Sequence, residues 1–209
     1  MNIDEVLQRW LQIEYYCMSR RLGFINKQLD PDYRLIVDTI RCLDYQTTMV
    51  NRVSTDKIIG ILALMWEHVD KKQYDLRELV IKILSRIGYS TSAIIADKDY
   101  NHETNQFSPI CSVLDKVTLT LQQAKYEISI GNKKCVLTAF QKKLWNALEC
   151  KKILGVSAPT SAGKSYTIQL DTARKMLAEK MDVIYIVPTL SLLNQVVEDY
   201  HKLLIQVGI

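Results

Sequence analysis

Apolar side chains recur every three or four residues through the first hundred positions, the spacing at which they share one face of an α-helix. Residues 58–65 are apolar nearly all round, which predicts the most buried helix of the group. The pattern therefore predicts a helical bundle over residues 1–100. Its other three stripes are Leu7, Leu11, Tyr15, Met18 and Leu22; Tyr33, Ile36, Val37, Ile40 and Leu43; and Leu76, Leu79, Val80, Ile83, Leu84 and Ile87.

Residues that favour helix ends lie at the borders of these stripes. Asp30 before Pro31, and Ser108 before Pro109, are pairs typical of an N-cap followed by a first helical turn. Gly88 is placed to end a helix, because glycine readily adopts the left-handed conformation found there. These signals predict the borders of three helices.

A polar segment separates this region from the rest of the chain. Residues 97–108 lack any periodicity, so we interpret them as a loop between domains. One more helical stripe follows, from Ile110 to Ala124. We therefore expect a helical bundle at residues 1–100, a connector with a helix at 101–125, and a second domain at 126–209.

The second domain begins with a change of period from helical to alternating. The Gly131-Asn132 pair is typical of a tight hairpin turn. A hairpin is therefore expected, with its apolar positions at Tyr126, Ile128, Ile130, Cys135 and Leu137.

Strand and helix signals then alternate. A helix is expected from about residue 140 to 148, and apolar runs at 153–156 and 183–187 are typical of buried strands. A helical pattern through Ala178 lies between the runs, and another follows residue 188. This alternation predicts the start of a parallel α/β domain, so the fold class is α + α/β.

Composition and charge narrow the class of protein. Apolar residues make up 48% and charged residues 24%, which is ordinary for a folded globular chain. No apolar run reaches the roughly 18 residues of a membrane span, and charges interrupt the N-terminal stretch, so we expect a cytoplasmic protein without a membrane partner. Residues 1–125 carry 16 Lys+Arg and 16 Asp+Glu, whereas residues 126–209 carry 11 and 7. Only the second region is expected to meet polyanions.

Metal and disulfide chemistry are not indicated. The five cysteines are odd in number and never spaced as C-x-x-C, so we expect reduced thiols. The three histidines fit no metal-ligand spacing. Tyr15, Tyr16 and Trp66 lie on or beside the apolar stripes, so we expect them in the core and not on a base-stacking surface.

One segment carries the chemistry of phosphate binding. It reads Ala158-Pro159-Thr160-Ser161-Ala162-Gly163-Lys164-Ser165, between an expected strand and an expected helix. Gly163 lets the chain curl so that backbone N–H groups converge on an anion, and the helix N-terminus adds its positive end. Lys164 is expected to reach the β- and γ-phosphates, and the Ser165 hydroxyl to coordinate Mg²⁺. The alternative is an ordinary helix start at Gly163-Lys164.

This segment resembles motif I of superfamily 2 helicases, most closely the Ski-like DExH branch. Ala158 stands where many phosphate loops have glycine. The resemblance implies a RecA-like domain, ATP with Mg²⁺ as cofactors, and catalytic roles for Lys164 and Ser165. It also implies nucleotide contacts from Gln141, Ala158, Pro159, Thr160, Ser161, Ala162, Gly163, Lys164, Ser165 and Tyr166.

Two further positions resemble motifs of that family. Phe140-Gln141, 23 residues before Lys164, is similar to the Q motif, whose glutamine reads the adenine; alternatively Gln141 is a solvated residue. Pro188-Thr189, after the second apolar run, is similar to motif Ia, which contacts the phosphates of a single strand. Alternatively, Thr189 or Ser191 caps a helix, and a cap also serves as an anion site.

The family's motif II is not found in these residues. The one adjacent Asp-Glu pair is Asp4-Glu5, far before the loop. We therefore expect an N-terminal fragment of an ATP-dependent DNA or RNA helicase that ends before motif II and is inactive alone. The competing interpretation is an interaction module attached to a nucleotide-dependent switch that does not unwind nucleic acid.

The helical region has a separate expected role. Its balanced charge does not favour binding to phosphates, but it is compatible with a surface that binds a protein. We expect residues 1–100 to dock a partner protein, and an antiviral defence operon that pairs such a helicase with a nuclease would fit. The alternative is that the bundle only braces the first helicase lobe.

Overall fold

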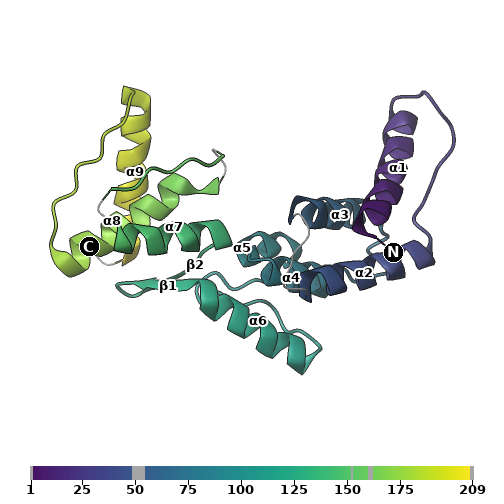
Figure 1. The fold of residues 1–209 in the computed structure, drawn as a ribbon, viewed down its shortest axis with the longest axis horizontal. Coiled ribbons are helices and arrows are strands. Elements are labelled where there is room, and N and C mark those ends of the chain that lie inside the picture. Colours follow the sequence, from purple (N-terminus) through teal and green to yellow (C-terminus); the bar gives the residue numbers. More distant parts are fainter. Residues whose placement is uncertain (1, 49–54, 152, 160–161, 208–209) are drawn as a thin grey trace. The chain divides into compact units, whose positions relative to one another are not determined.

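The computed structural model describes residues 2–48, 55–151, 153–159 and 162–207 (Figure 1). They form two compact units. The first comprises residues 1–100 and 107–122, and the second residues 101–106 and 123–209.

The first helix of the first unit is α1 (Ile3–Arg21). Its N-terminus is a capping box: the Asn2 side chain accepts from a first-turn N–H, and the Glu5 side chain accepts from the Asn2 N–H. The face that enters the core carries Ile3, Val6, Trp10 and Ile13. The sequence predicted the helix correctly but the wrong buried face, because the members of the Leu11–Leu22 stripe, Tyr15 included, are exposed.

Three more helices contribute to the core of this unit. They are α2 (Tyr33–Thr48), α3 (Thr55–His68) and α4 (Arg77–Arg86). Helix α3 was expected to be the most buried helix, but it buries four of its 14 residues, Ile58, Ile61, Leu62 and Met65, whereas α4 buries five of 10. Tyr16 and Trp66 are partly buried. The short helices α5 (Ser90–Ala93) and η1 (Ile94–Ala96) follow.

The helix borders differ from two of the three sequence predictions. Gly88, with φ of +88°, follows α4 as predicted. Helix α2 begins two residues after Pro31, and it is Asp32, not Asp30, whose carboxylate accepts from the Leu35 N–H at 2.6 Å.

The second misplaced cap belongs to α6 (Val113–Tyr126). Ser112, not Ser108, accepts from a first-turn amide, that of Asp115, at 3.2 Å. Ser108 instead donates to the buried carboxylate of Asp97, through both its N–H and its hydroxyl, at 2.7 Å each. Asp97 also lies 3.7 Å from Arg77, so this network fastens the chain to the start of α4.

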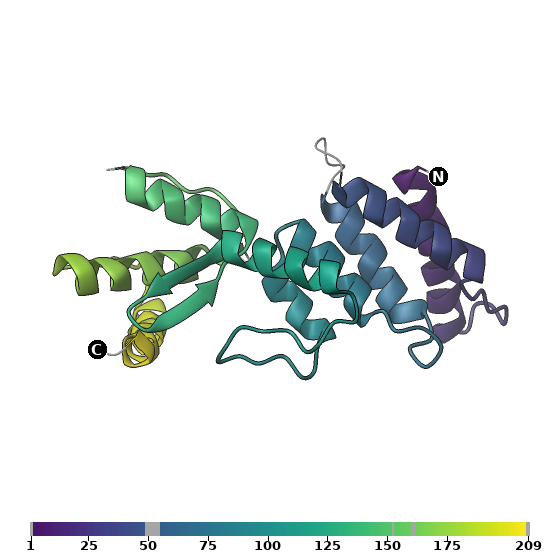
Figure 2. The same ribbon diagram turned by 90° about the horizontal axis from the view of Figure 1, so that it is seen from below.

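The second unit contains the predicted hairpin (Figure 2). Strands β1 (Glu127–Ile130) and β2 (Lys133–Val136) pair antiparallel, with Ile130 opposite Lys133. Gly131 makes the turn at φ of +55°, and a β-carbon there would lie 2.7 Å from the backbone oxygen of Val207. Glycine is therefore required both by the backbone angle and by the close approach.

Three helices pack with this hairpin. They are α7 (Ala139–Cys150), α8 (Lys164–Glu179) and α9 (Leu190–Val207). They share a core with it, to which α8 contributes Leu170 and Ala173. The buried members of this core are Ile128, Ile130, Cys135, Leu137, Trp145, Leu170, Ala173, Leu203 and Val207.

The two buried strands predicted for this unit are not formed. Segments 153–159 and 182–188 contain no strand, and the two-stranded hairpin is the sheet seen among the described residues. Ile153, Ile184 and Ile186 are exposed. The structure thus has the hairpin and the helices predicted for residues 126–209, without the two predicted parallel strands.

Candidate nucleotide-binding site

The N-terminus of α7 is closed by a reciprocal pair of hydrogen bonds. The Thr138 hydroxyl accepts from the Gln141 N–H at 3.2 Å, and the Gln141 side-chain oxygen accepts from the Thr138 N–H at 2.8 Å. This capping box satisfies two N–H groups that a helix start otherwise leaves unpaired. It also holds the Gln141 amide in one orientation.

The Gln141 amide nitrogen lies beside Gly163 of the phosphate loop. Gly163 is the N-cap of α8 and has φ of +74°, in the left-handed region that favours glycine. A β-carbon on Gly163 would overlap the Gln141 amide nitrogen and lie 3.3 Å from its Cδ. The structure thus brings together two predicted site residues that are 22 positions apart in the chain.

Lys164, the first residue of α8, folds back over its own loop. Its ammonium donates to the carbonyl oxygens of Ala158 and Pro159, the latter at 2.7 Å. The Ala162 N–H also donates to the Pro159 oxygen at 3.1 Å. The ammonium group predicted to contact the phosphates is therefore hydrogen-bonded to the phosphate loop itself.

The start of α8 has the properties of an anion site. No side chain caps it, so its first N–H groups and the positive end of the helix dipole are available. Ser165, in the first turn, is exposed. These features fit a phosphate with its Mg²⁺. Two predicted loop residues, Thr160 and Ser161, lie outside the described residues.

Tyr166 follows Lys164 and Ser165 in the first turn of α8, and its side chain contacts Cys135 of the hairpin. Partial burial, together with the neighbouring sulfur of Cys135, raises the pKa of the Tyr166 hydroxyl. Tyr166 was predicted as a nucleotide contact. Its contact with Cys135 gives it a second role, in joining α8 to β2.

A charge cluster that the sequence reasoning missed holds α8 against α7. The buried carboxylate of Asp171 pairs with Arg174 at 2.8 Å and with Lys175 at 2.7 Å. The Arg174 guanidinium lies 5.3 Å from the centre of the Trp145 ring on α7 and 3.8 Å from Glu149. The hydrogen bond with Asp171 raises the pKa of Arg174. The i, i+3 and i, i+4 spacing of these charges was the available signal.

The predicted nucleic-acid residues Pro188 and Thr189 are exposed at the start of α9. The Thr189 hydroxyl accepts from the Leu192 N–H at 3.3 Å, which is the capping role that was the alternative interpretation. Because a capped helix start still presents N–H groups, this geometry is compatible with either role.

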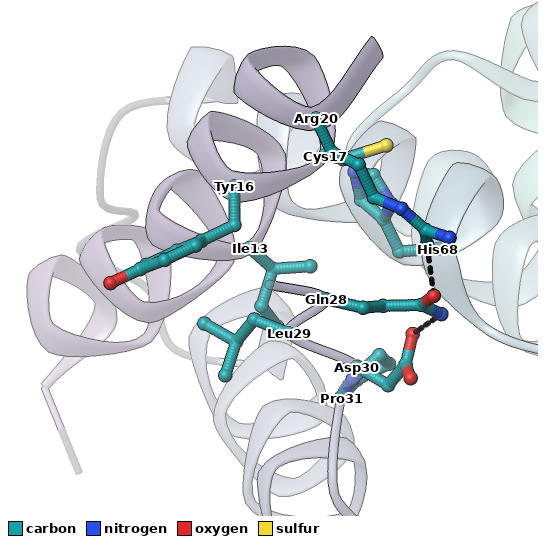
Figure 3. A pocket seen from close by; sticks show the side chains of 9 residues that line it. All are labelled: Ile13, Tyr16, Cys17, Arg20, Gln28, Leu29, Asp30, Pro31 and His68. Carbon is teal, nitrogen blue, oxygen red and sulfur yellow. Dashed lines mark hydrogen bonds between the residues drawn. The ribbon is translucent and has the colours of Figure 1, made fainter. Parts of the chain in front are cut away.

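A separate cavity of about 100 Å³ lies in the first unit (Figure 3). Arg20 donates to the Gln28 side chain, whose amide donates to Asp30 at 2.7 Å. His68 at its edge pairs with Glu14. These polar groups are paired with one another, and we assign the cavity no ligand. Its lining residues are Ile13, Tyr16, Cys17, Arg20, Gln28, Leu29, Asp30, Pro31 and His68.

Neither a metal centre nor a membrane-spanning helix is found in the described part of the chain. Among those residues, no group of three or more His, Cys, Asp or Glu side chains is placed to hold a metal ion, and the cysteines there are free. Within the same residues, no helix is both long enough and apolar enough to cross a membrane.

A protein-family model matches part of the second unit. Residues 138–209, about a third of the chain, match the family model described as DEAD/DEAH box helicase. The match begins at Thr138, the cap of the helix that carries Gln141, and includes the phosphate loop. It supports a helicase superfamily for this part of the chain. Neither the curated proteins nor the solved structures gave a match.

Proposed function

We propose that this chain belongs to an ATP-dependent helicase or translocase of the DExH, Ski-like branch that acts on DNA or RNA. The observation that carries the proposal is the contact between Gln141 and Gly163. It joins the residue expected to read adenine to the loop expected to bind phosphates. Residues 126–209 would then form the start of the first RecA-like lobe.

The roles follow from the geometry at the start of α8. Lys164 would leave the Ala158 and Pro159 carbonyl oxygens to contact the β- and γ-phosphates, and the uncapped N–H groups would bind their oxygens. Ser165 would hold Mg²⁺, which when bound neutralises phosphate charge. Gln141 would select the base.

The nucleic-acid contact is proposed at Pro188 and Thr189. The start of α9 offers N–H groups to a phosphate, and residues 126–209 carry the net positive charge of the chain. Contacts of this kind bind a strand without reading its sequence. A single strand of DNA or RNA is therefore the proposed substrate, in the cytoplasm.

These 209 residues alone are proposed to bind nucleotide but hydrolyse essentially none. Hydrolysis in this class needs a carboxylate that holds Mg²⁺ and orients the attacking water. The one adjacent Asp-Glu pair, Asp4-Glu5, lies in the capping box of α1, where Asp4 pairs with Lys57. This pair belongs to the first unit, where it stabilises the start of α1.

A docking role is proposed for the helical bundle of residues 1–100. Its first helix exposes several large apolar side chains on the face turned away from the core. A surface of that kind suits a protein partner better than a phosphate backbone. Under the alternative, bracing role, changes to that face would alter only the stability of the chain.

Nucleotide binding by the 209-residue chain tests the proposed site. We expect a fluorescent ATP analogue with Mg²⁺ to bind, and Lys164→Ala to weaken binding at least about tenfold, as expected when a charge partner of the phosphates is removed. Lys202→Ala is the matched control, since Lys202 is an exposed lysine on α9 of the same unit. Equal affinity in all three proteins would refute the assignment of this loop.

A second measurement separates a helicase from a nucleotide switch. Fluorescence anisotropy with a labelled single strand should show binding that depends on Mg²⁺-nucleotide and weakens in Thr189→Ala. Binding of nucleotide without any binding of a strand would favour the switch. Salt dependence of the affinity checks that phosphate contacts are responsible.

A further inference from the structure

Helix α1 has two apolar faces, and only one of them is used by the bundle. The second face is exposed, although it is as apolar as the first. It consists of Leu11, Tyr15, Met18 and Leu22, which are 43%, 66%, 45% and 64% exposed. Single exposed apolar residues are normal on a protein, but a contiguous row marks an interaction surface.

The four positions follow the spacing of a helix-pairing seam. They are separated by four, three and four residues, which corresponds to d-a-d-a of a heptad repeat. A second helix laid along this seam would bury all four side chains. The natural occupant is therefore another amphipathic helix.

Charges beside the seam specify which helix and in which direction. Glu14 and Arg21 both occupy the g position on the same edge of the seam. If a second copy of α1 runs antiparallel, Leu11 lies opposite Leu22, Tyr15 opposite Met18, and Glu14 opposite Arg21, twice by symmetry. In a parallel pair Glu14 would lie opposite Ser19, without an ion pair. The seam is thus complementary to itself in one orientation.

The present contacts of these two charges leave room for that pairing. Glu14 bonds with His68, and Arg21 lies 3.4 Å from Glu67, both at the end of α3. The Arg21 and Glu67 side chains are exposed, so this pair is held weakly and is free to accept a further charge. In the antiparallel pair, Glu67, Arg21, and Glu14 of the second copy would alternate in sign.

We infer that α1 pairs antiparallel with α1 of a second copy of this chain through Leu11, Tyr15, Met18 and Leu22, with Glu14 opposite Arg21. This inference rests on the proposed docking role of residues 1–100 and names the partner. The seam is only about three turns long, so the interface is below the standard size of stable complexes, and we expect a weak dimer.

Sedimentation equilibrium of the 209-residue chain over a range of concentrations tests the pairing. We expect a concentration-dependent monomer–dimer equilibrium with a dissociation constant on the order of 10 µM. Met18→Glu should weaken it at least about tenfold, because a charge would enter the seam. Ile95→Glu, at an 83% exposed apolar position of the same unit, is the matched control. Far-UV circular dichroism checks that each variant is folded.

Charge variants test the orientation. Glu14→Arg alone places Arg opposite Arg21, and Arg21→Glu alone places Glu opposite Glu14, so each variant should dimerise at least about tenfold more weakly. An equal mixture of the two should form a heterodimer with both ion pairs restored. The double variant E14R/R21E should also recover the affinity.

Three results would overturn the inference. They are a monomer at every concentration, a dimer unaffected by Met18→Glu, and a mixture that fails to recover. If the wild-type chain is monomeric but binds a different protein, such as a nuclease, and Met18→Glu abolishes that binding, self-pairing is refuted. The docking role of residues 1–100 would then remain. Nucleotide binding at Lys164 is measured separately, so failure of the dimer is distinguishable from failure of the ATP site.

Discussion

The side-chain amide nitrogen of Gln141 lies so close to Gly163 that no β-carbon fits between them. The oxygen of the same amide accepts from the Thr138 N–H. One side chain therefore caps α7 and limits the shape of the phosphate loop. The two contacts use different atoms of the amide, the oxygen at the cap and the nitrogen at the loop.

Gly163→Ala should disturb both the backbone and this contact. A residue with a β-carbon at φ of +74° costs about 1–2 kcal/mol, and the Gln141 amide would have to move. We expect a less stable second unit and a loss of nucleotide affinity, measured by thermal unfolding and by the fluorescent ATP analogue. Gly155→Ala is the control, because its β-carbon would meet open space. Similar behaviour of the two variants would contradict the geometry.

Variants of Gln141 should separate its two contacts. Gln141→Glu keeps the capping box, since glutamate serves equally at that position, but replaces the amide nitrogen by a carboxylate oxygen near the phosphates. We expect near-normal stability with nucleotide affinity reduced at least about tenfold. Thr138→Ala should do the reverse, lowering stability by about 0.5–2 kcal/mol through loss of the cap. Thermal unfolding and nucleotide titration of both variants distinguish the two contacts.

The two contacts of Gln141 differ in whether they could be predicted from the sequence. Thr138-x-x-Gln141 is a capping-box spacing, so the orientation of the glutamine was open to prediction from local rules alone. Its approach to Gly163 was not, because it depends on how α7 packs on α8. The Asp171, Arg174 and Lys175 cluster that fixes this packing has a recognisable helical spacing, but its link to Trp145 is tertiary.

Helix α1 shows a second limit of prediction from the sequence. Ile3, Val6, Trp10 and Ile13 and the Leu11–Leu22 stripe both follow helical periodicity. Periodicity predicts the helix but does not decide which stripe faces the bundle, because that choice is made by the partner helices. Similarly, Asp30 and Asp32 both suit an N-cap, and only the chain's path selects Asp32.

Asp97 should contribute to the stability of the first unit in a pH-dependent way. Its burial raises the carboxyl pKa, but hydrogen bonds from Ser108 and Asp99 and the charge of Arg77 outweigh this, so the pKa is lowered. A lowered pKa stabilises the fold above the ordinary carboxyl pKa of about 3.9, and that stability is lost as the pH falls through the native pKa.

Asp97→Asn is therefore expected to cost about 1–3 kcal/mol at neutral pH, where the wild-type carboxylate is charged and accepts from Ser108. The difference from wild type should shrink in acid. Asp99→Asn is the control, because the exposed Asp99 contributes its backbone N–H, which that change keeps. Thermal unfolding from pH 7 to pH 3 measures both variants. A constant difference across that range would contradict the charged role of Asp97.

The absent parallel strands have a physical cause that residue patterns do not reveal. Apolar runs such as 183–187 predict a strand buried on both faces, but a strand forms only when a neighbour accepts its hydrogen bonds. Among the described residues, segment 182–188 has no such neighbour. Its side chains alternate between partly buried and exposed, as a strand's would with one face covered.

Substitutions in segment 182–188 test whether it is an exposed segment, as in the structure, or a buried strand, as the sequence predicts. Ile184 and Ile186 are 88% and 87% exposed, so the double variant I184S/I186S should change stability by no more than about 0.5 kcal/mol. If both residues were buried in a parallel sheet, each polar replacement would instead cost about 2 kcal/mol or more. Leu170→Ala, at a fully buried position of α8, is the reference for a core loss of about 2–5 kcal/mol. Thermal unfolding compares the three proteins, and a double variant as unstable as Leu170→Ala would show that the 209-residue chain forms the buried strand.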